Sequence, residues 1–308
     1  MDELRYREAE QRLWRSLDAA PTDRSLPLDR TGVTVRVQEL GEGPPIVFVH
    51  GGSISGTSWA PLAARLPGFR CIMLDRPGCG LSPPLAVGLR DVDRFANFSE
   101  ALIVDVLDGL GLERAGVAAT SFGGYTALRS AAAHPDRIER VMEFGFPIGA
   151  PLGKVPFVMR LATVPMLGVL AASIPPTRAS VRMIFRQIGL GQALAAGRIS
   201  PEAVDWFLSM LRDTDTMVNE IKSVPQFITP LRGMNERLLL PTSLLESIRV
   251  PVHFLWGTED PFGGEAIARA FVPHIPHATL ELVPGAGHAV WMDDPELAAS
   301  NTRAFFSA

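Results

Sequence analysis

The stretch VAATSFGGYTAL, residues 117–128, carries the strongest structural signal in this sequence. Small apolar residues run into Ser121, and two glycines, Gly123 and Gly124, follow it closely. A serine between a buried strand and a helix is typical of the sharp turn called a nucleophile elbow, whose usual pattern is G-x-S-x-G. Ala119 stands where that pattern has its first glycine. The alternative interpretation is that Ser121 caps an ordinary buried helix.

Strand-like runs separated by helical segments surround this stretch. Apolar and β-branched residues concentrate in runs at residues 33–40, 45–52, 69–80, 115–121, 138–146, 250–260 and 278–288. Strands that alternate with helices predict a mostly parallel sheet covered by helices on both faces. The sequence therefore predicts an α/β fold.

The alternation stops near Pro147 and returns about a hundred residues later. Between these points the chain reads as helical, is rich in proline and methionine, and has no clear strand. We therefore expect an α/β core over residues 1–148 and 246–308, in which residues 1–20 form a helical extension. Residues 149–245 are expected to form an inserted helical cap or lid.

Inside this insertion, residues 200–223 are predicted to form one amphipathic helix. Ser200 is placed to cap its start, where a hydroxyl accepts a hydrogen bond from an otherwise unpaired N–H. Trp206, Met210 and Met217 widen its apolar stripe beyond what simple packing needs. These three residues are candidates for lining a substrate pocket, and packing within the cap is the alternative.

Composition and charge exclude several classes of function. The chain is 47% hydrophobic and 20% charged, as expected of a folded globular protein, and its net charge of −4 is small. No basic block predicts nucleic acid or anionic lipid as a partner. The longest apolar run, residues 161–176, is interrupted by Pro165 and is too short to span a bilayer. The charged start predicts an amphipathic helix rather than a secretory signal. The two cysteines, Cys71 and Cys79, form no disulfide framework and are expected to be reduced thiols of a cytoplasmic protein.

Chemistry-bearing residues follow several of the predicted strands. In a parallel sheet, functional groups gather just beyond the carboxyl ends of the strands. Ser121, Asp260 and His288 each follow such a strand, and so does the loop HGGSISG that begins at His50. Their chain order, serine then aspartate then histidine, is that of the α/β-hydrolase triad.

Five motifs in the right order extend this similarity over nearly the whole chain. They are HGG at 50–52 with SW downstream, DRPGCGLS at 75–82, TSFGG at 120–124, WGTEDPF at 256–262 and GAGH at 285–288. With them the chain resembles the α/β-hydrolase superfamily, in particular its serine hydrolases of carboxylesterase type. The resemblance implies a mostly parallel central sheet flanked by helices, with an inserted α-helical cap. No metal-ligand spacing, nucleotide motif or flavin motif is present, so we expect no cofactor and no metal.

The resemblance also implies a role for each residue of the triad. Ser121 is expected to be the nucleophile, and His288 the base that takes its proton and later returns it to the leaving group. Asp260 is expected to fix the imidazole tautomer and stabilise the imidazolium. Glu259 and Glu143 remain alternative acids, because one is adjacent to Asp260 and some relatives take the acid from the earlier strand that carries the other.

Two backbone N–H groups are expected to bind the oxyanion. The N–H of Phe122 lies at the positive end of the helix that follows the elbow. The resemblance favours Gly52 as the second donor, with Ser53 as the alternative. Losing one such donor typically costs about 3 kcal/mol of barrier height.

The apolar, methionine-rich insertion predicts a small, neutral, hydrophobic substrate. The leading hypothesis is the hydrolysis of a carboxylic ester or lactone through an acyl-enzyme. One alternative is a C–C bond hydrolase of aromatic ring-cleavage products, whose substrate carboxylates basic groups would hold. The candidate basic groups are Arg160, Arg178, Arg182 and Arg186. The other alternative is a non-catalytic ligand receptor on the same fold.

Overall fold

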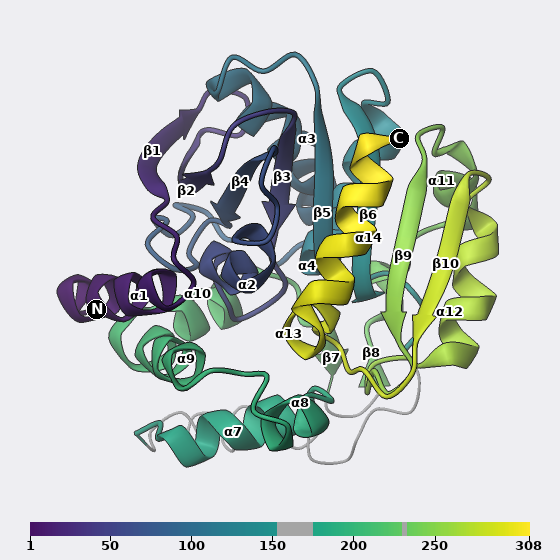
Figure 1. The fold of residues 1–308 in the computed structure, drawn as a ribbon. Coiled ribbons are helices and arrows are strands. Elements are labelled where there is room, and N and C mark those ends of the chain that lie inside the picture. The colour runs from purple at the N-terminus through teal and green to yellow at the C-terminus, as the bar shows by residue number, and fades with distance from the viewer. Residues whose placement is uncertain (153–174, 230–232) are drawn as a thin grey trace.

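The computed structural model describes residues 1–152, 175–229 and 233–308, and one eight-stranded sheet organises them (Figure 1). The strand order is β1-β2-β4-β3-β5-β6-β9-β10. Neighbours from β4 to β10 run parallel, whereas β1 and β2 join one edge antiparallel. The strands are β1 Thr22–Leu28, β2 Val33–Leu40, β3 Pro45–Val49, β4 Arg70–Asp75, β5 Ala115–Ser121, β6 Ile138–Pro147, β9 Val252–Gly257 and β10 Ala278–Val283.

Helices cover both faces of this sheet, as the α/β pattern predicts. In Figure 1, α14 crosses the near face and α3 and α4 lie behind the sheet. The helices of the far face are α3 Val92–Gly109, α4 Phe122–Ala133, α11 Thr242–Ser247 and α12 Glu265–Phe271, with the short η3 Val272–His274. Those of the near face are α1 Glu3–Ser16, η1 Gly56–Trp59, α2 Ala60–Ala63, α13 Val290–Asp293 and α14 Pro295–Ser307.

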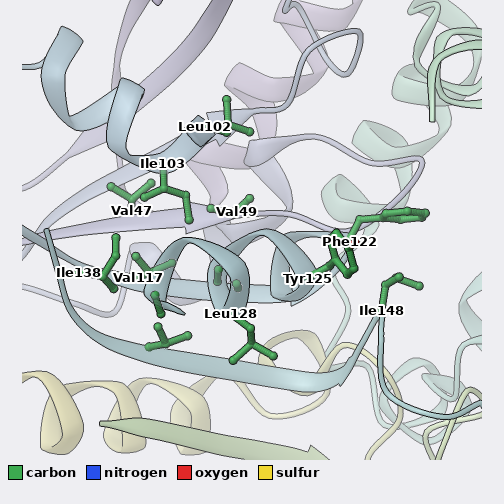
Figure 2. Packing of buried hydrophobic residues seen from close by; sticks show 14 of the residues in the cluster. Val47, Val49, Leu102, Ile103, Val117, Phe122, Tyr125, Leu128, Ile138 and Ile148 are labelled. Carbon is green, nitrogen blue, oxygen red and sulfur yellow. The ribbon is translucent and has the colours of Figure 1, made fainter. Parts of the chain in front are cut away.

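The central strands β3 and β5 are apolar because both of their faces are buried. In Figure 2, Val47 and Val49 of β3 and Val117 of β5 lie between Ile103 of α3 and Leu128 of α4, and all five belong to one buried cluster. Burial of such side chains stabilises the fold by about 1.5–3 kcal/mol each. The predicted strands are confirmed, and the start of α4 is thereby fixed at the end of β5.

Strand β1 was not predicted, for a physical reason. Five of its seven residues are exposed, and only Leu26 and Leu28 are buried. Pro27 is tolerated there because β1 is an edge strand with a single neighbour. Such a segment lacks the apolar run by which a central strand is recognised.

The insertion between β6 and β9 is mainly helical in its described part. Before α11, which packs on the far face of the sheet, its elements are α7 Arg178–Gln187, α8 Gly191–Ala195, α9 Pro201–Asp213, α10 Thr216–Ser223, β7 Ile228–Thr229, β8 Gly233–Met234 and η2 Glu236–Leu238. The pair β7 and β8 corrects the expectation of no strand in the insertion. The apolar run predicted at 161–176 lies outside the described residues up to position 174, and the division at residues 149 and 245 stays a proposal.

The prediction of one helix over residues 200–223 is wrong at its middle. The start is confirmed, since the Ser200 side chain accepts a hydrogen bond from the N–H of Ala203. The helix breaks at Thr214, whose backbone is extended and whose hydroxyl donates to the Met210 carbonyl and contacts the Thr216 hydroxyl. Side-chain bonds of this kind compete with backbone helix bonds. The break lets α10 turn toward the core.

The amino-terminal helix α1 is confirmed, and it packs against α9. Leu13 and Trp14 are buried, and the indole N–H of Trp206 donates to the hydroxyl of Tyr6 at 3.3 Å. The helix α1 therefore joins the insertion to the core.

Within the described ranges, no helix combines the length and apolar character needed to cross a bilayer.

The order of the strands places a topological switch point at the carboxyl ends of β3 and β5. The chain passes from β3 to β4 on one side and then to β5 on the other, while Val49 pairs with Ala119 across the two central strands. Loops that leave such a switch point diverge and leave room for a ligand at the carboxyl ends of the strands. The HGG loop and Ser121 both start from this point.

Candidate active site

Ser121 occupies a strained turn between β5 and α4. Its φ of 55° and ψ of −119° lie in a region that side-chain-bearing residues rarely adopt. Backbone strain of this kind costs about 1–3 kcal/mol and persists where the surrounding structure enforces it. A 2.9 Å hydrogen bond from the N–H of Ile148 to the Ser121 carbonyl oxygen helps to hold the turn. This geometry is that of a nucleophile elbow, and the side chain is only partly buried.

The glycine after the elbow is sterically required. A Cβ on Gly123 would collide with the carbonyl oxygen of Val49 and lie 2.8 Å from that of His50. The position before the elbow accepts a methyl group, because Ala119 fits there fully buried in β5. This sequence therefore departs from the G-x-S-x-G pattern only at its first glycine, position 119, where the structure has room for a methyl group.

His288 and Asp260 form a buried hydrogen-bonded pair. Nδ1 of His288 lies 2.8 Å from Oδ2 of Asp260. The backbone N–H groups of Phe146 and Phe262 each donate to the same carboxylate at 3.0 Å. Because the Asp260 carboxylate is the acceptor in these hydrogen bonds, Nδ1 of His288 is the ring nitrogen that carries the proton. Nε2 of His288, free of any hydrogen-bond partner among the described residues, is then left as the basic nitrogen.

The two alternative acids do not contact this histidine. Glu259 is exposed, and its side chain makes no hydrogen bond within the described part of the chain. Glu143 is completely buried on β6, and its carboxyl group faces Gly124 of α4. Both Glu143 oxygens lack a hydrogen-bond partner among the described residues, and burial raises the pKa of this carboxyl group well above its usual range. Asp260 is thus the acid that the geometry favours.

The carboxyl end of β6 lies between the elbow and the histidine. Ser121 pairs with Pro147 in the sheet register. A Cβ on Gly145 would lie 2.5 Å from the carbonyl oxygen of His288 and 3.0 Å from Oδ2 of Asp260. The structure therefore brings the three predicted residues to the same end of neighbouring strands.

The predicted oxyanion loop, residues 50–53, lies directly beside the elbow and is called the oxyanion loop below. A Cβ on Gly51 would be 3.0 Å from Cβ of Ser121, and one on Gly52 would be 3.1 Å from the ring of Phe122. Phe122 is the first residue of α4, where an N–H has no intrahelical acceptor. The Gly52 N–H likewise has no acceptor among the described residues, whereas the N–H of Ser53 donates to Glu220. This use of the Ser53 N–H favours Gly52 over the alternative donor.

A buried network lies beneath the oxyanion loop. The N–H of Arg76 donates to Nε2 of His50 at 2.9 Å, so Nδ1 of His50 carries the proton and donates to the Gly51 carbonyl. Burial and the Arg76 charge hold the pKa of His50 well below its usual range, which keeps the ring neutral. Nη2 of Arg76 also donates to the Gly51 carbonyl and pairs with Glu220. Glu220 was not singled out in the sequence, because a pair 144 residues apart leaves no local pattern.

The candidate substrate-lining residues have different surroundings. Trp206 and Met210 are almost fully buried in the cluster that includes Tyr6 and Leu13 of α1. Met217 of α10 is 38% exposed. The contacts of Trp206 and Met210 are those of packing, and contact of any of the three with a substrate stays a prediction. In the described part of the chain no three His, Cys, Asp or Glu side chains are grouped to hold a metal ion.

Comparison with known proteins identifies a family. Residues 46–300 match the model of the alpha/beta hydrolase family. A 2-hydroxy-6-oxononadienedioate/2-hydroxy-6-oxononatrienedioate hydrolase of Burkholderia vietnamiensis is 25% identical over 271 residues, covering 85% of this chain and 88% of the relative.

Solved structures share the fold. The naproxen esterase of Bacillus subtilis has a TM-score of 0.72 at 20% identity, with 99% of each chain covered. The 2-hydroxy-6-oxo-6-phenylhexa-2,4-dienoate hydrolase of Rhodococcus sp. strain RHA1 has a TM-score of 0.71 at 18% identity, covering 94% of this chain and 100% of that one. At such identities the structural likeness establishes the fold alone.

Proposed function

We propose that this chain, which belongs to the alpha/beta hydrolase family, is a serine hydrolase that cleaves a hydrophobic carboxylic ester or lactone. The observation that carries the proposal is the buried pair of His288 and Asp260, 2.8 Å apart, at the sheet end where Ser121 stands on a strained elbow. A neutral hydroxyl is a poor nucleophile, so a base held in one tautomer beside it is what acyl transfer requires.

The proposed reaction has two halves. Oγ of Ser121 attacks the acyl carbonyl while Nε2 of His288 takes its proton, and Asp260 stabilises the imidazolium that forms. The N–H groups of Gly52 and Phe122 stabilise the oxyanion of the tetrahedral intermediate. The imidazolium then protonates the departing alcohol, which leaves an acyl-enzyme. Water, deprotonated by His288, attacks the carbonyl carbon of this ester. The bond to Oγ of Ser121 then breaks, His288 returns the proton to Oγ, and the acid is released.

Electrostatics supports a neutral substrate. Arg76, whose guanidinium reaches the oxyanion loop, is neutralised by Glu220. Arg178, Arg182 and Arg186 of α7 are exposed, and Arg178 is paired with Asp205; Arg160 lies outside the described residues. No free cation among these described arginines is thus buried and ready to hold a substrate carboxylate. In this proposal residues 149–245 form the cap over the site, and the cytoplasm is the expected location.

A second candidate is the hydrolysis of a C–C bond in a ring-cleavage product. It is favoured by the names of two relatives, which describe hydrolases of hydroxy-oxo-dienoic acids. The same triad would serve this reaction, but the substrate would carry one or two carboxylates.

An ester panel compared with a dienoate substrate tests the proposal. We expect the wild type to hydrolyse p-nitrophenyl esters of short and medium chain length, and the Ser121→Ala variant to lose that activity. Loss of absorbance of a 2-hydroxy-6-oxo-dienoate, faster than ester cleavage at equal concentration, would favour the second candidate. Ester hydrolysis by the wild type no faster than by Ser121→Ala would reject the first.

A further inference from the structure

Glu220 reaches from the insertion into the core of the molecule. It lies on α10, and its side chain is only 7% exposed. Two contacts hold this helix against the loop that follows β4: Thr216 accepts a hydrogen bond from the N–H of Gly80, and Asn219 donates one to the carbonyl of Gly78, both at 3.0 Å. The carboxylate is therefore delivered to a fixed position beneath the oxyanion loop.

The Glu220 carboxylate is linked to both neighbours of Gly52, directly to Ser53 and through Arg76 to Gly51. Its two oxygens each lie 2.9 Å from Nη2 of Arg76, and one of them accepts the N–H of Ser53 at 3.1 Å. The same oxygen accepts the thiol proton of Cys79, also at 3.1 Å. Burial, reinforced by the Glu220 charge, raises the pKa of this thiol well above its usual range, so it stays a hydrogen-bond donor.

These contacts determine which way the Gly52 N–H points. The Gly51 carbonyl accepts hydrogen bonds from His50 and from Nη2 of Arg76, at 2.7 Å and 2.8 Å. A trans peptide is planar, with its C=O and N–H pointing in opposite directions. Because Gly51 and Gly52 share one peptide group, the Gly52 N–H faces away from this network. The next peptide group is held in turn through its Ser53 N–H.

From this geometry we propose that Glu220 is a positioning residue for the oxyanion hole, acting through Arg76 and Ser53 to hold the Gly52 N–H toward the elbow. The inference rests on the proposed serine hydrolase function. The insertion then does more than cover the substrate, because one of its side chains completes the catalytic geometry of the core. Among the described residues Glu220 is the only carboxylate paired with Arg76. A buried guanidinium left without its counter-charge is strongly destabilised in place, so loss of Glu220 is expected to loosen its hold on the Gly51 carbonyl.

The test separates transition-state stabilisation from substrate binding. In Glu220→Gln the shape is kept and the charge is lost; in Glu220→Asp the charge is kept and the reach to Ser53 shortens. We expect both variants to lower kcat for an ester by about tenfold or more, since loss of an oxyanion donor costs about 10²–10³-fold. KM should change little. The inhibition constant of an alkyl boronic acid, which forms a tetrahedral adduct with the serine, should rise in parallel with the fall in kcat/KM.

Asp213→Asn is the matched control. Asp213 is also a buried acid of the insertion and is paired with Arg212, but it bonds no residue of the oxyanion loop. This variant should keep the wild-type kcat. If Glu220→Gln does not fold, the Glu220→Asp variant provides the test, because its carboxylate still neutralises the charge of Arg76.

Three results would overturn the inference. They are a wild-type kcat in a folded Glu220 variant, a rise in KM that accounts for the whole loss, and an unchanged boronic acid affinity. A wild-type protein that neither hydrolyses esters nor binds the boronic acid would instead reject the proposed function, and the inference with it.

Discussion

The backbone N–H of His288 donates a 2.8 Å hydrogen bond to the carbonyl oxygen of Ile188. Ile188 directly follows α7 in the insertion, so the loop that carries the candidate base is fastened to a segment outside the core. Close backbone packing reinforces the contact, since a Cβ on Gly189 would lie 2.5 Å from Cα of Gly287. The insertion thus contacts both the histidine loop and the oxyanion loop.

This contact predicts that Gly189→Ala lowers kcat. The added methyl would push the histidine loop away from Ser121, and a displacement of about 1 Å can cost about 10²-fold in rate. Gly197→Ala is the control, because Gly197 also has a positive φ, of 70°, but apart from its chain neighbours no atom of the described residues lies within 4 Å of its Cβ position. Equal kcat values for the two variants would argue against a role for the contact.

Asp260→Asn is expected to lower kcat by about 10⁴-fold while the protein stays folded, because the amide can leave His288 in the wrong tautomer. The variants Glu259→Gln and Glu143→Gln should keep most of the activity, since neither side chain contacts the imidazole. Steady-state ester hydrolysis measures all three. A larger loss in either glutamate variant than in Asp260→Asn would contradict the assignment of the acid.

The two small residues of the elbow should respond in opposite ways. Gly123→Ala is expected to abolish activity and to destabilise the fold by about 1–3 kcal/mol, because its methyl would collide with the backbone of β3. Ala119→Gly, which restores the usual motif, should keep activity and lose only about 0.5–1 kcal/mol of stability. Ester assays and urea denaturation give both values. A Gly123→Ala variant of normal activity would show that the elbow can shift without loss.

The buried carboxyl group of Glu143 predicts a pH-dependent stability. Burial raises its pKa in the folded state well above the ordinary value of 4.5, so above that pH the folded chain binds more protons than the unfolded one. The free energy of unfolding therefore falls as the pH rises from about 4.5 toward the folded-state pKa.

Glu143→Gln removes this fall and should make the protein more stable than wild type at pH 8, with little effect below pH 4.5. Urea denaturation over the pH range measures the effect, with the exposed Glu259→Gln as control. If the free energy of unfolding changed with pH in the same way for wild type and Glu143→Gln, ionisation of the Glu143 carboxyl group would not destabilise the folded protein.

Sequence patterns predicted the elements that depend on local signals. The central strands are continuous apolar runs, and Ser121, Asp260 and His288 lie just past their ends because parallel strands place such residues at one edge. The edge strand β1 was missed because half-exposed strands carry charges, and the break at Thr214 was missed because hydroxyl bonds override helical periodicity. Glu220 was missed because an ion pair between distant segments has no spacing to detect.

The location of a covalent adduct tests the central claim most directly. The protein is treated with a fluorophosphonate, digested, and the labelled residue found by mass spectrometry, with Ser121→Ala treated in parallel. The account predicts one stoichiometric adduct on Ser121 and none on the variant. An adduct on another residue, or no adduct on a folded wild-type protein, would contradict it.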